Sequence, residues 1–259
     1  MKASILIANY NSARFIKDCI NSLINQSYKN IEIICFDDAS NDNSPEEIKK
    51  FKNVKLILNN NNKKEYGCYN QINSYKSAFE YSTGDIIFFL DSDDYFKTNK
   101  VEQVINRFKN DDNLKILFDL PTFTFKDKKI IKKKNYSFLD NYWPFLPPQS
   151  CISISRNYVS KLFNLIDFDE FPEIWMDFRI GIASKYIFNQ LNILEESLTF
   201  YRQSNTNISS NYKTLSKNWW KRRLEAHKYV LHFFKKNKIT HSKNLDYLIT
   251  SLVNKFYAS

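Results

Sequence analysis

The first half of the chain alternates short apolar runs with segments whose apolar residues recur at helical spacing. The apolar runs predict buried strands at residues 4–8, 31–36, 54–58 and 86–90. The helical spacing predicts helices at residues 14–26, from Ser44 onward as a cap with Pro45 in the first turn, and at 70–81. Because strands and helices alternate, the sequence predicts an α/β fold with a doubly wound, mostly parallel sheet.

The second half follows a less regular pattern. Helices are predicted at residues 99–108, at 156–165 and within 175–191. Extended segments are predicted at residues 115–125, 151–155 and 193–202, with a lysine-dense hairpin or loop at 126–134. From residue 217 onward the chain is predicted to be helical, basic and aromatic.

Polar residues follow three of the predicted strands where each strand ends. These are Asn9-Tyr10-Asn11, Asp37-Asp38 and Asp91-Ser92-Asp93-Asp94. In open parallel sheets, ligands bind outside the carboxyl ends of the strands. We therefore expect these side chains to converge on one crevice.

Composition narrows the ways in which a ligand can be held. The only glycines are Gly67, Gly84 and Gly181, so neither a dinucleotide fingerprint nor a Walker loop can be written. Any nucleotide must be held by other means. The formal net charge of +10 is compatible with nucleic acid, anionic lipid, phosphorylated substrates or simply a solvated lysine-rich surface.

The four cysteines show no metal-binding or disulfide spacing, and Cys19 and Cys35 lie within apolar patterns typical of buried thiols. No apolar segment approaches the roughly 20 residues that span a bilayer. The N-terminal apolar run turns polar at Asn9, too early for a signal peptide. These features predict a soluble or peripheral protein in the cytoplasm.

The acidic cluster that begins at Asp91 is the sharpest local signal. Carboxylates at positions i and i+2 of a tight turn can both reach one hard cation that binds substrate phosphates. A departing nucleoside diphosphate needs such charge neutralisation. The same residues would also suit a turn and helix cap before Asn99.

Two further acids are candidates, each with a structural alternative. Asp38 could accept an N–H of a pyrimidine base with help from Ser40, or the pair could simply end a strand in a turn. Asp177, beside Trp175 in an apolar helical stretch, could have a raised proton affinity and act as a general base. Alternatively it pairs with Arg179 or serves as an acid at a helix N-terminus.

The order and spacing of these motifs resemble the glycosyltransferase family 2. The resemblance rests on SILIANYN at 4–11, SLINQSY at 22–28, EIICFDDAS at 32–40 and TGDIIFFLDSDD at 83–94. A weaker match runs from Cys151 to Ser209 and includes Phe200-Tyr201-Arg202. The last 45 or so residues match no family pattern.

The resemblance implies a GT-A-type fold and transfer of a sugar from a nucleoside diphosphate donor with inversion. It divides the chain into a catalytic domain, 1–215, and a basic aromatic helical tail, 216–259. Within the domain, 1–96 would bind the nucleotide sugar and 97–215 would bind the acceptor.

Roles for single residues follow from the same resemblance. Asn9 and Asn11 would line the nucleotide pocket, and Asp38, with Ser40, would contact the base. Asp91 would touch the ribose or sugar, Asp93 would bind Mn²⁺ or Mg²⁺, and Asp177 would deprotonate the acceptor hydroxyl.

Three departures from the family pattern stand out. Met176 lies where the family usually has Glu, and Ser204 lies where it often has His. Residues 65–78 lack the usual Arg-Asn pair, although Gln71, Asn73 and Lys76 are available to contact a donor.

The tail combines aromatic residues with clustered cations, beginning at Trp219-Trp220-Lys221-Arg222-Arg223. This combination suits an interfacial helix on anionic lipid. A helix packed on the catalytic domain with solvated lysines is the alternative. Contact with a membrane would make a lipid-linked saccharide a natural acceptor.

Taken together, the sequence predicts an inverting hexosyl- or N-acetylhexosaminyltransferase that uses a UDP-sugar and a saccharide or lipid-linked saccharide acceptor. It would work in the cytoplasm, at the inner face of the membrane if the tail binds lipid. A nucleotidyltransferase and a non-catalytic nucleotide- or glycan-binding relative are the alternatives. Nucleic-acid binding would explain the charge but not three acidic strand ends, so no nucleic-acid partner is expected.

Overall fold

The computed structural model describes residues 1–59, 65–125, 128–130, 146–166, 170–203, 212–241 and 244–258. The strands are β1 (Ala3–Asn9), β2 (Ile31–Asp37), β3 (Val54–Leu58), β4 (Ile86–Asp91), β5 (Tyr95–Phe96), β6 (Ile116–Phe125), β7 (Lys128–Ile130), β8 (Ile152–Ser155) and β9 (Asn192–Arg202). The α-helices are α1 (Ile16–Ile24), α2 (Ser44–Lys49), α3 (Gly67–Glu80), α4 (Lys100–Asn110), α5 (Arg156–Leu165), α6 (Met176–Tyr186), α7 (Lys217–Lys236) and α8 (Leu245–Ala258), with a 3₁₀ turn at η1 (Gln149–Cys151).

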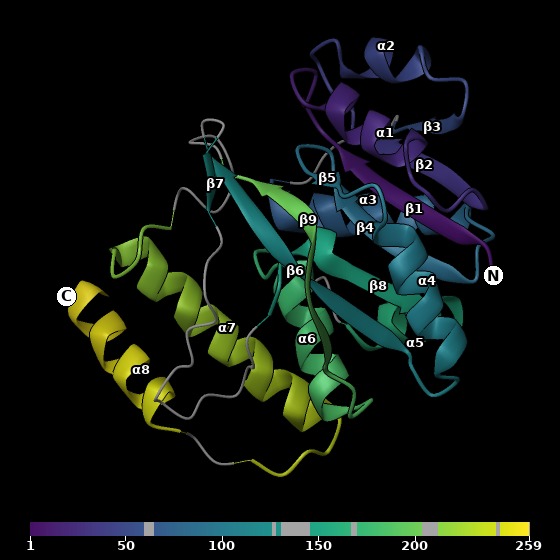
Figure 1. Ribbon diagram of the computed structural model, residues 1–259. Coiled ribbons are helices and arrows are strands. Elements are labelled where there is room, and N and C mark those ends of the chain that lie inside the picture. Colours follow the sequence, from purple (N-terminus) through teal and green to yellow (C-terminus); the bar gives the residue numbers. More distant parts are fainter. Residues whose placement is uncertain are drawn as a thin grey trace.

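The described strands form one sheet in the order β3-β2-β1-β4-β8-β6-β9-β5, with β7 paired to β6 (Figure 1). The first four strands are parallel, as the alternating pattern predicts. Beyond β4 the sheet is mixed, because β8 runs antiparallel to both β4 and β6. The doubly wound prediction therefore describes the first half of the chain, and the second half extends the same sheet.

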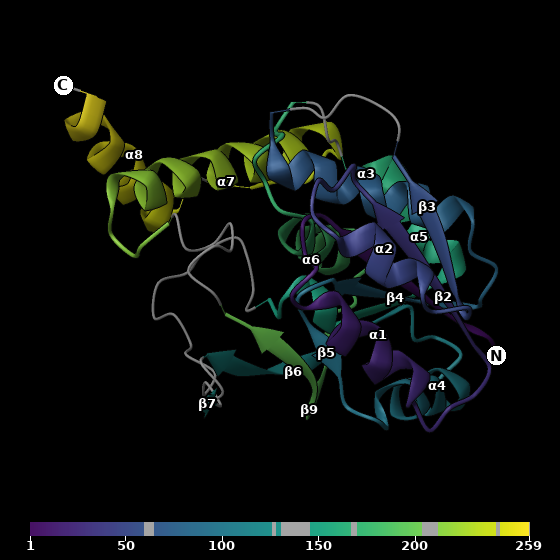
Figure 2. The same ribbon diagram turned by 90° about the horizontal axis from the view of Figure 1, so that it is seen from above.

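Strand β1 shows how the apolar alternation builds two cores. Ala3, Ile5 and Ile7 pack in one buried cluster with α1 and α4, while Leu6 points to the opposite cluster with α3 and α5. Figure 2 shows the sheet between these two groups of helices. Burial on both faces explains why these strands read as continuous apolar runs rather than as alternating ones.

Gly84 matters because the backbone just before β4 lies tightly against the start of β1. A Cβ atom at this position would lie 2.5 Å from Ser4 Oγ and 2.6 Å from Ser4 N. The Gly84 N–H instead donates a hydrogen bond to Ser4 Oγ at 2.7 Å. A larger residue here would push β4 away from β1.

Most predicted elements match the structure to within a few residues, with one wrong detail at α2. Helix α2 begins at Ser44, and its N-cap is Asn43 rather than Ser44. The Ser44 hydroxyl instead donates to the Asp42 carboxylate and accepts from the Ser12 N–H, so it ties two loops together. Of the hairpin or loop predicted at 126–134, only β7 falls within the described residues.

The tail contains two helices whose apolar residues point in opposite directions. In α7, Tyr229, Val230, Phe233 and Phe234 are buried in the core cluster that also contains residues of α3 and α5. Of the two alternatives for the tail, α7 therefore fits the helix that packs on the rest of the chain. Helix α8 lies beyond α7, away from the sheet, in both ribbon views (Figures 1 and 2). No helix within the described ranges is both long enough and apolar enough to cross a membrane.

Candidate active site

A cavity of about 850 Å³ opens where the central strands end. The parallel register pairs Asn9 with Asp37 and Ala8 with Asp91, so β1, β2 and β4 finish at one edge. Of the predicted site residues, Asn9, Asn11, Asp38, Asp91, Asp93 and Asp177 line this cavity. The structure thus brings together residues separated by more than 160 positions, within the usual volume range of ligand pockets.

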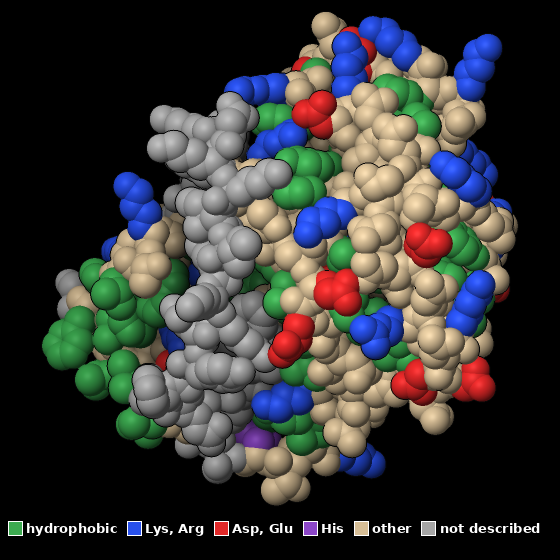
Figure 3. Space-filling model, in the orientation of Figure 1, with side chains coloured by type: hydrophobic (Ala, Val, Ile, Leu, Met, Phe, Trp, Pro, Cys, Tyr) green, Lys and Arg blue, Asp and Glu red, His purple; other side chains and the backbone are tan. Residues whose placement is uncertain are grey.

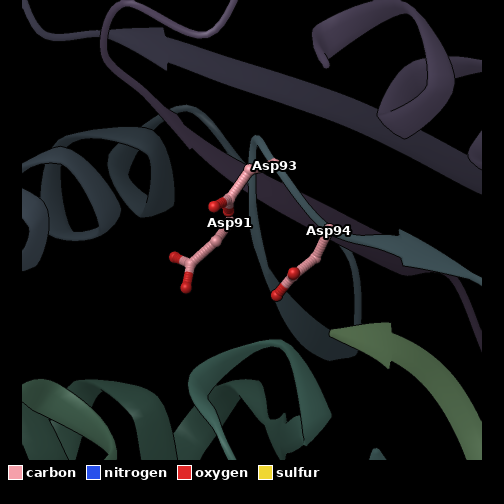
Figure 4. Close-up of side chains that lie close together, drawn as sticks. All are labelled: Asp91, Asp93 and Asp94. Carbon is pink, nitrogen blue, oxygen red and sulfur yellow. The ribbon is translucent and has the colours of Figure 1, made fainter. Parts of the chain in front are cut away.

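The turn after β4 holds three carboxylates close together. One oxygen from each of Asp91, Asp93 and Asp94 lies within 4.8 Å of the others. Figure 4 shows the three side chains directed to the same side of this turn. The Asp94 N–H donates to Asp91 O at 3.0 Å, which closes the turn. The turn interpretation of this segment is therefore correct, and it is the turn that gathers the acids.

Asp91 and Asp94 are held by neighbours from distant parts of the chain. Asp91 Oδ1 accepts hydrogen bonds from Gln71 Nε2 and from Tyr75 Oη, both at 2.7 Å. Asp94 Oδ2 accepts from Ser150 Oγ at 2.6 Å, and its Oδ1 accepts from Arg202 N at 2.8 Å. Asp93 belongs to the same turn and lines the cavity.

Burial disfavours the charged form of all three acids, and for Asp93 and Asp94 the charges of neighbouring acids add to this effect. Burial is the main cause that raises the pKa of Asp91, and with the Asp91 charge it raises the pKa of Asp93 to about 7. The pKa of Asp94 is raised well above its usual range by burial and by both neighbours. Oxygen ligands crowded in this way fit a hard divalent cation, whose charge would offset the repulsion.

Asp177 faces the same cavity from another direction. It lies in the first turn of α6, and its Oδ1 accepts the N–H of Phe178 at 2.9 Å. It is thus both a helix N-terminal acid and a cavity residue. Burial raises its pKa to about 7, and the nearby Arg222 charge acts in the opposite direction. A carboxylate with this pKa can exchange a proton near neutral pH.

The end of β2 contributes two buried acids, and one of them lines the cavity. Asp38 lines the cavity and accepts a hydrogen bond from Asn59 Nδ2 at 2.7 Å. Asp37 is buried and accepts from Asn9 Nδ2 at 2.6 Å and from Ser40 Oγ at 2.7 Å. Ser40 is not among the described residues that line the cavity. Its hydroxyl also accepts the Asn11 N–H at 2.9 Å, so it positions the loop that follows β1.

For several cavity residues the sequence predicts no role in the site. Trp175, Gln149, Tyr201 and Arg222 all line it. The buried Gln149 side chain has no hydrogen-bond partner at either amide atom among the described residues. Gln71 lines the cavity, whereas Asn73 and Lys76 of α3 are not among its lining residues, and Ser204 lies outside the described residues.

A buried ion pair supports the acidic turn from behind. Lys100 Nζ lies 2.6 Å from Asp119 Oδ1, and both side chains are almost fully buried. The same ammonium donates to Ser150 O at 2.8 Å, and Ser150 Oγ contacts both Asp91 N and Asp94. A lysine within a helix gives no sequence sign of such a role, because only the fold brings Asp119 and Ser150 to it.

Met176, which lies where the family usually has Glu, points into the protein core. Its side chain is buried in the core cluster beneath α6. Arg179, the alternative partner considered for Asp177, donates from Nε to Ile174 O at 2.9 Å and from Nη2 to Phe171 O. The start of α6 therefore presents Asp177 to the cavity.

Comparison with known proteins gives consistent results. The family model described as "Glycosyl transferase family 2" matches residues 4–168. An uncharacterized glycosyltransferase from Nostoc sp. is 29% identical over 219 residues, which are 78% of this chain and 65% of that protein, so the match spans slightly less than two thirds of that relative. The Escherichia coli UDP-Glc:alpha-D-GlcNAc-diphosphoundecaprenol beta-1,3-glucosyltransferase WfaP is 29% identical over 80% of each chain.

A solved structure supports the fold over most of the chain. Staphylococcus aureus TarS 1-349 in complex with UDP-GlcNAc superposes with a TM-score of 0.65 at 15% sequence identity. The superposition covers 89% of this chain and 67% of that one. The predicted GT-A-type fold is therefore confirmed.

Proposed function

The chain belongs to glycosyltransferase family 2, and on that premise we propose that it transfers a hexosyl or N-acetylhexosaminyl group from a UDP-sugar to a saccharide hydroxyl, with inversion. One observation carries this proposal. The acidic turn after β4 and the carboxylate of Asp177 line the same cavity, and Asp93 and Asp177 both have pKa values raised to about 7. The acidic turn is suited to bind a cation that contacts a diphosphate, and the Asp177 carboxylate is suited to accept the proton of a hydroxyl group.

The reaction is a single displacement with Asp177 as the general base. The acceptor hydroxyl donates its proton to the Asp177 carboxylate as its oxygen forms a bond to the anomeric carbon. The bond from that carbon to the diphosphate oxygen breaks on the opposite face, and the nucleoside diphosphate leaves with the electron pair. Because Asp177 has a pKa of about 7, a large fraction of it is deprotonated at neutral pH.

The residues of the acidic turn fit a divalent metal. Asp93, which faces the cavity, would hold Mn²⁺ or Mg²⁺, with Asp91 beside it on the side of the ribose or sugar. When bound, the ion would neutralise charge on the departing diphosphate. Gln71 and Tyr75 hold the Asp91 carboxylate by their hydrogen bonds, so this side of the site is organised by the protein itself.

The nucleotide would bind at the ends of β1 and β2. Asp38, Asn9 and Asn11 line this part of the cavity, and Ser40 would act through the loop that it holds. The buried Asn9 Oδ1 has no hydrogen-bond partner among the described residues, which leaves an acceptor for a ligand N–H or hydroxyl. The TarS complex, which has a similar fold, contains UDP-GlcNAc, and this supports a UDP-sugar as donor.

We propose a lipid-linked saccharide as the acceptor, because the name of the relative WfaP describes a diphosphoundecaprenol-linked substrate. The charge of the tail supports a position at an anionic membrane. Residues 217–259 contain ten lysines and arginines but only two acidic residues, so they carry +8 of the chain's net charge of +10. Such a segment is attracted to the anionic inner face of a cell membrane.

Helix α8 offers the apolar contact that such binding requires. Its outward residues Leu245, Leu248, Leu252 and Phe256 are exposed, the last by 74%. Figure 3 shows apolar side chains gathered at that end of the molecule. The polar side of α8 faces α7, where Asp246 contacts Arg223 Nη2 at 2.6 Å and His227 Nε2 at 3.1 Å. An amphipathic helix with its apolar side outward and cations nearby suits an anionic bilayer.

The membrane contact can be tested separately from catalysis. Leu252→Ser with Phe256→Ser should abolish sedimentation with vesicles that contain anionic lipid, and wild-type protein should not bind vesicles of neutral lipid. Turnover of a water-soluble acceptor should stay unchanged. Binding of the double variant equal to wild type would contradict this surface, and a concentration-dependent dimer lost in the variant would identify a second copy as its occupant.

The proposed activity is tested by incubating the full chain with Mn²⁺, a panel of UDP-sugars and a lipid-diphosphate-linked saccharide. We expect UDP release that depends on both donor and acceptor, and a β-linked product from an α-linked donor by NMR. Retention of configuration would contradict the displacement mechanism. Release of pyrophosphate from a nucleoside triphosphate would indicate a nucleotidyltransferase, and UDP binding without turnover of any donor would indicate a non-catalytic relative.

A further inference from the structure

Acidic residues outnumber basic residues among the described residues that line the main cavity. Five acidic residues line it: Asp38, Glu65, Asp91, Asp93 and Asp177. Within the described part of the chain, Arg222 is the one lysine or arginine among the lining residues. A diphosphate that enters this cavity adds further negative charge, so a positive partner from the protein has a large effect there.

Arg222 comes from the tail but is fixed against the catalytic domain. Its guanidinium carbon lies 4.1 Å from the ring centroids of both Trp175 and Tyr212. These cation–π contacts hold the group in place while its N–H donors remain directed along the guanidinium plane. A guanidinium held in this way loses little conformational entropy when it binds an anion.

The hydrogen-bonding capacity of Arg222 is largely unused. Its Nη2 donates to Cys68 Sγ at 3.9 Å, and sulfur is a weak acceptor. Its Nε is buried and has no hydrogen-bond partner among the described residues. Buried donors without partners are rare in proteins, and a functional role is one of the explanations for such a group.

We infer that Arg222 binds the diphosphate group of a substrate in this cavity, so that the tail completes the active site. This inference rests on the proposed function. It also assigns a role to α7 beyond packing, since the helix carries a cation into a site that is otherwise acidic. Charge-assisted, bidentate hydrogen bonds are the interaction for which the guanidinium is suited.

Two diphosphates could use this residue, that of the donor and that of a lipid-linked acceptor. Arg222 lines both the main cavity and a second cavity of about 390 Å³, which is also lined by Glu173, Tyr212, Asn218 and Lys221. A donor would reach Arg222 from the main cavity, and an acceptor diphosphate from the second. Lys221 lines only the second cavity, so its substitution separates the two sources.

The donor arm of the test is calorimetric titration of UDP and of uridine into the full chain with Mn²⁺. If Arg222 binds the donor diphosphate, Arg222→Met should weaken UDP binding about tenfold or more and leave uridine binding unchanged. Arg222→Lys should recover part of the UDP affinity, because it keeps the charge but not the bidentate geometry. Lys228→Met removes an exposed cation from the same helix and is the matched control.

The acceptor arm measures KM for a saccharide linked to a short-chain prenyl diphosphate. If Arg222 binds the acceptor, Arg222→Met and Lys221→Met should both raise this KM, with unchanged affinity for UDP. For an acceptor that lacks the diphosphate, neither substitution should raise KM. The expected result in either arm supports binding of a diphosphate by Arg222, and the arm in which it is found identifies that diphosphate as the donor's or the acceptor's.

Three results would decide against a binding role. The inference would be overturned if Arg222→Met bound UDP with an affinity within twofold of wild type and also had KM values within twofold of wild type for the acceptors with and without the diphosphate. Equal weakening of UDP and uridine, or loss of the unfolding transition in both Arg222 variants, would show that the residue only joins α7 to the domain. Failure of wild-type protein to bind UDP with any metal would instead reject the proposed donor.

Gln149 carries a second, independent inference. It lines the cavity next to Ser150, which contacts both Asp91 and Asp94. Only 5% of Gln149 is exposed, and neither its Nε2 nor its Oε1 has a hydrogen-bond partner among the described residues. We infer that this amide binds hydroxyl groups of the transferred sugar, since adjacent hydroxyls offer both a donor and an acceptor.

The test separates sugar recognition from nucleotide binding. Gln149→Met keeps a similar volume but removes both polar atoms, so KM for the UDP-sugar should rise about tenfold while UDP affinity stays unchanged. Gln149→Glu keeps only acceptors and should change the preference among donors that differ at one hydroxyl. Unchanged KM and unchanged donor preference in both variants would overturn the inference, and so would equal losses for UDP and UDP-sugar.

Discussion

The ends of β2 and β4 look alike in sequence, since each places acidic residues directly after a buried strand, but they differ in how those acids are satisfied. At the end of β2, the buried Asp37 accepts hydrogen bonds from Asn9 Nδ2, Ser40 Oγ and Ser40 N at 2.6, 2.7 and 2.9 Å. The turn closes through Ala39, whose φ is +52°. Asp37 thus builds the loop around it.

At the end of β4, three carboxylates share a small space. One oxygen from each of Asp91, Asp93 and Asp94 lies within 4.8 Å of the others. Burial raises the pKa of all three carboxyl groups, and the charges of neighbouring acids raise those of Asp93 and Asp94 further. A carboxylate with full hydrogen bonding stabilises a fold, whereas crowded carboxylates at a cavity wall require a cation or a proton. The difference supports the proposal that the acids after β4 take part in the chemistry, while Asp37 of β2 holds the loop next to Asp38.

The largest effect is expected for Asp177 and Asp93, whose substitution should impair activity or metal binding rather than stability. Asp177→Asn should lower kcat by roughly 10³-fold, because the acceptor hydroxyl loses its base, while UDP affinity stays unchanged and the melting temperature does not fall. Asp93→Asn should abolish the metal dependence of UDP binding without unfolding the protein. UDP release assays and calorimetry check both variants, and near-normal turnover in Asp177→Asn would move the base elsewhere.

Substitution at the end of β2 should act on stability instead. Asp37→Ala leaves the Asn9 and Ser40 donors without their acceptor, so it should lower the free energy of unfolding by about 1–3 kcal/mol. Urea unfolding followed by circular dichroism measures this loss. The comparison fails if Asp37→Ala is as stable as wild type, or if Asp93→Asn loses as much stability as Asp37→Ala does.

A smaller effect is expected from the residues that hold Asp91. Tyr75→Phe removes one of the two hydrogen bonds to Asp91 Oδ1, so Mn²⁺ affinity should fall about tenfold with kcat at saturating metal nearly unchanged. Calorimetric titration of Mn²⁺ in the presence of UDP measures it. Tyr28→Phe, far from the cavity and bonded to Met1 O, is the control. Equal Mn²⁺ affinity in both variants would show that Tyr75 does not organise the site.

The smallest effect concerns pH. An acid with a raised folded-state pKa binds its proton more tightly when folded, so metal-free stability should decrease as pH rises from about 4 to the pKa of about 7 for Asp93 and Asp177, and stay low above it. Added Mn²⁺ should therefore raise the melting temperature by several degrees more at pH 8 than at pH 5.5. Scanning calorimetry checks this, and an equal shift at both pH values, or an undiminished one in Asp93→Asn, would contradict it.

Much of the fold could be predicted from local patterns. The four parallel strands and the helices between them follow from apolar runs and helical spacing, which depend on neighbours a few residues away. The acids at the strand ends could also be identified, because a parallel sheet brings its carboxyl ends to one edge. The chain by itself therefore determined the α/β class, its family, and the part of the cavity formed by Asn9, Asp38, Asp91 and Asp93.

Only the tertiary structure decided the rest, because the remaining contacts join residues far apart in the chain. Asp94 accepts its hydrogen bond from Arg202 N across 108 positions, and Arg222 reaches Cys68 across 154. The two tail helices show the same limit, since both have apolar positions at helical spacing. Packing against the domain buries those of α7, and the polar contacts of Asp246 with α7 turn those of α8 outward. Spacing reveals that a helix has an apolar face, but the surface that covers this face is set by the fold.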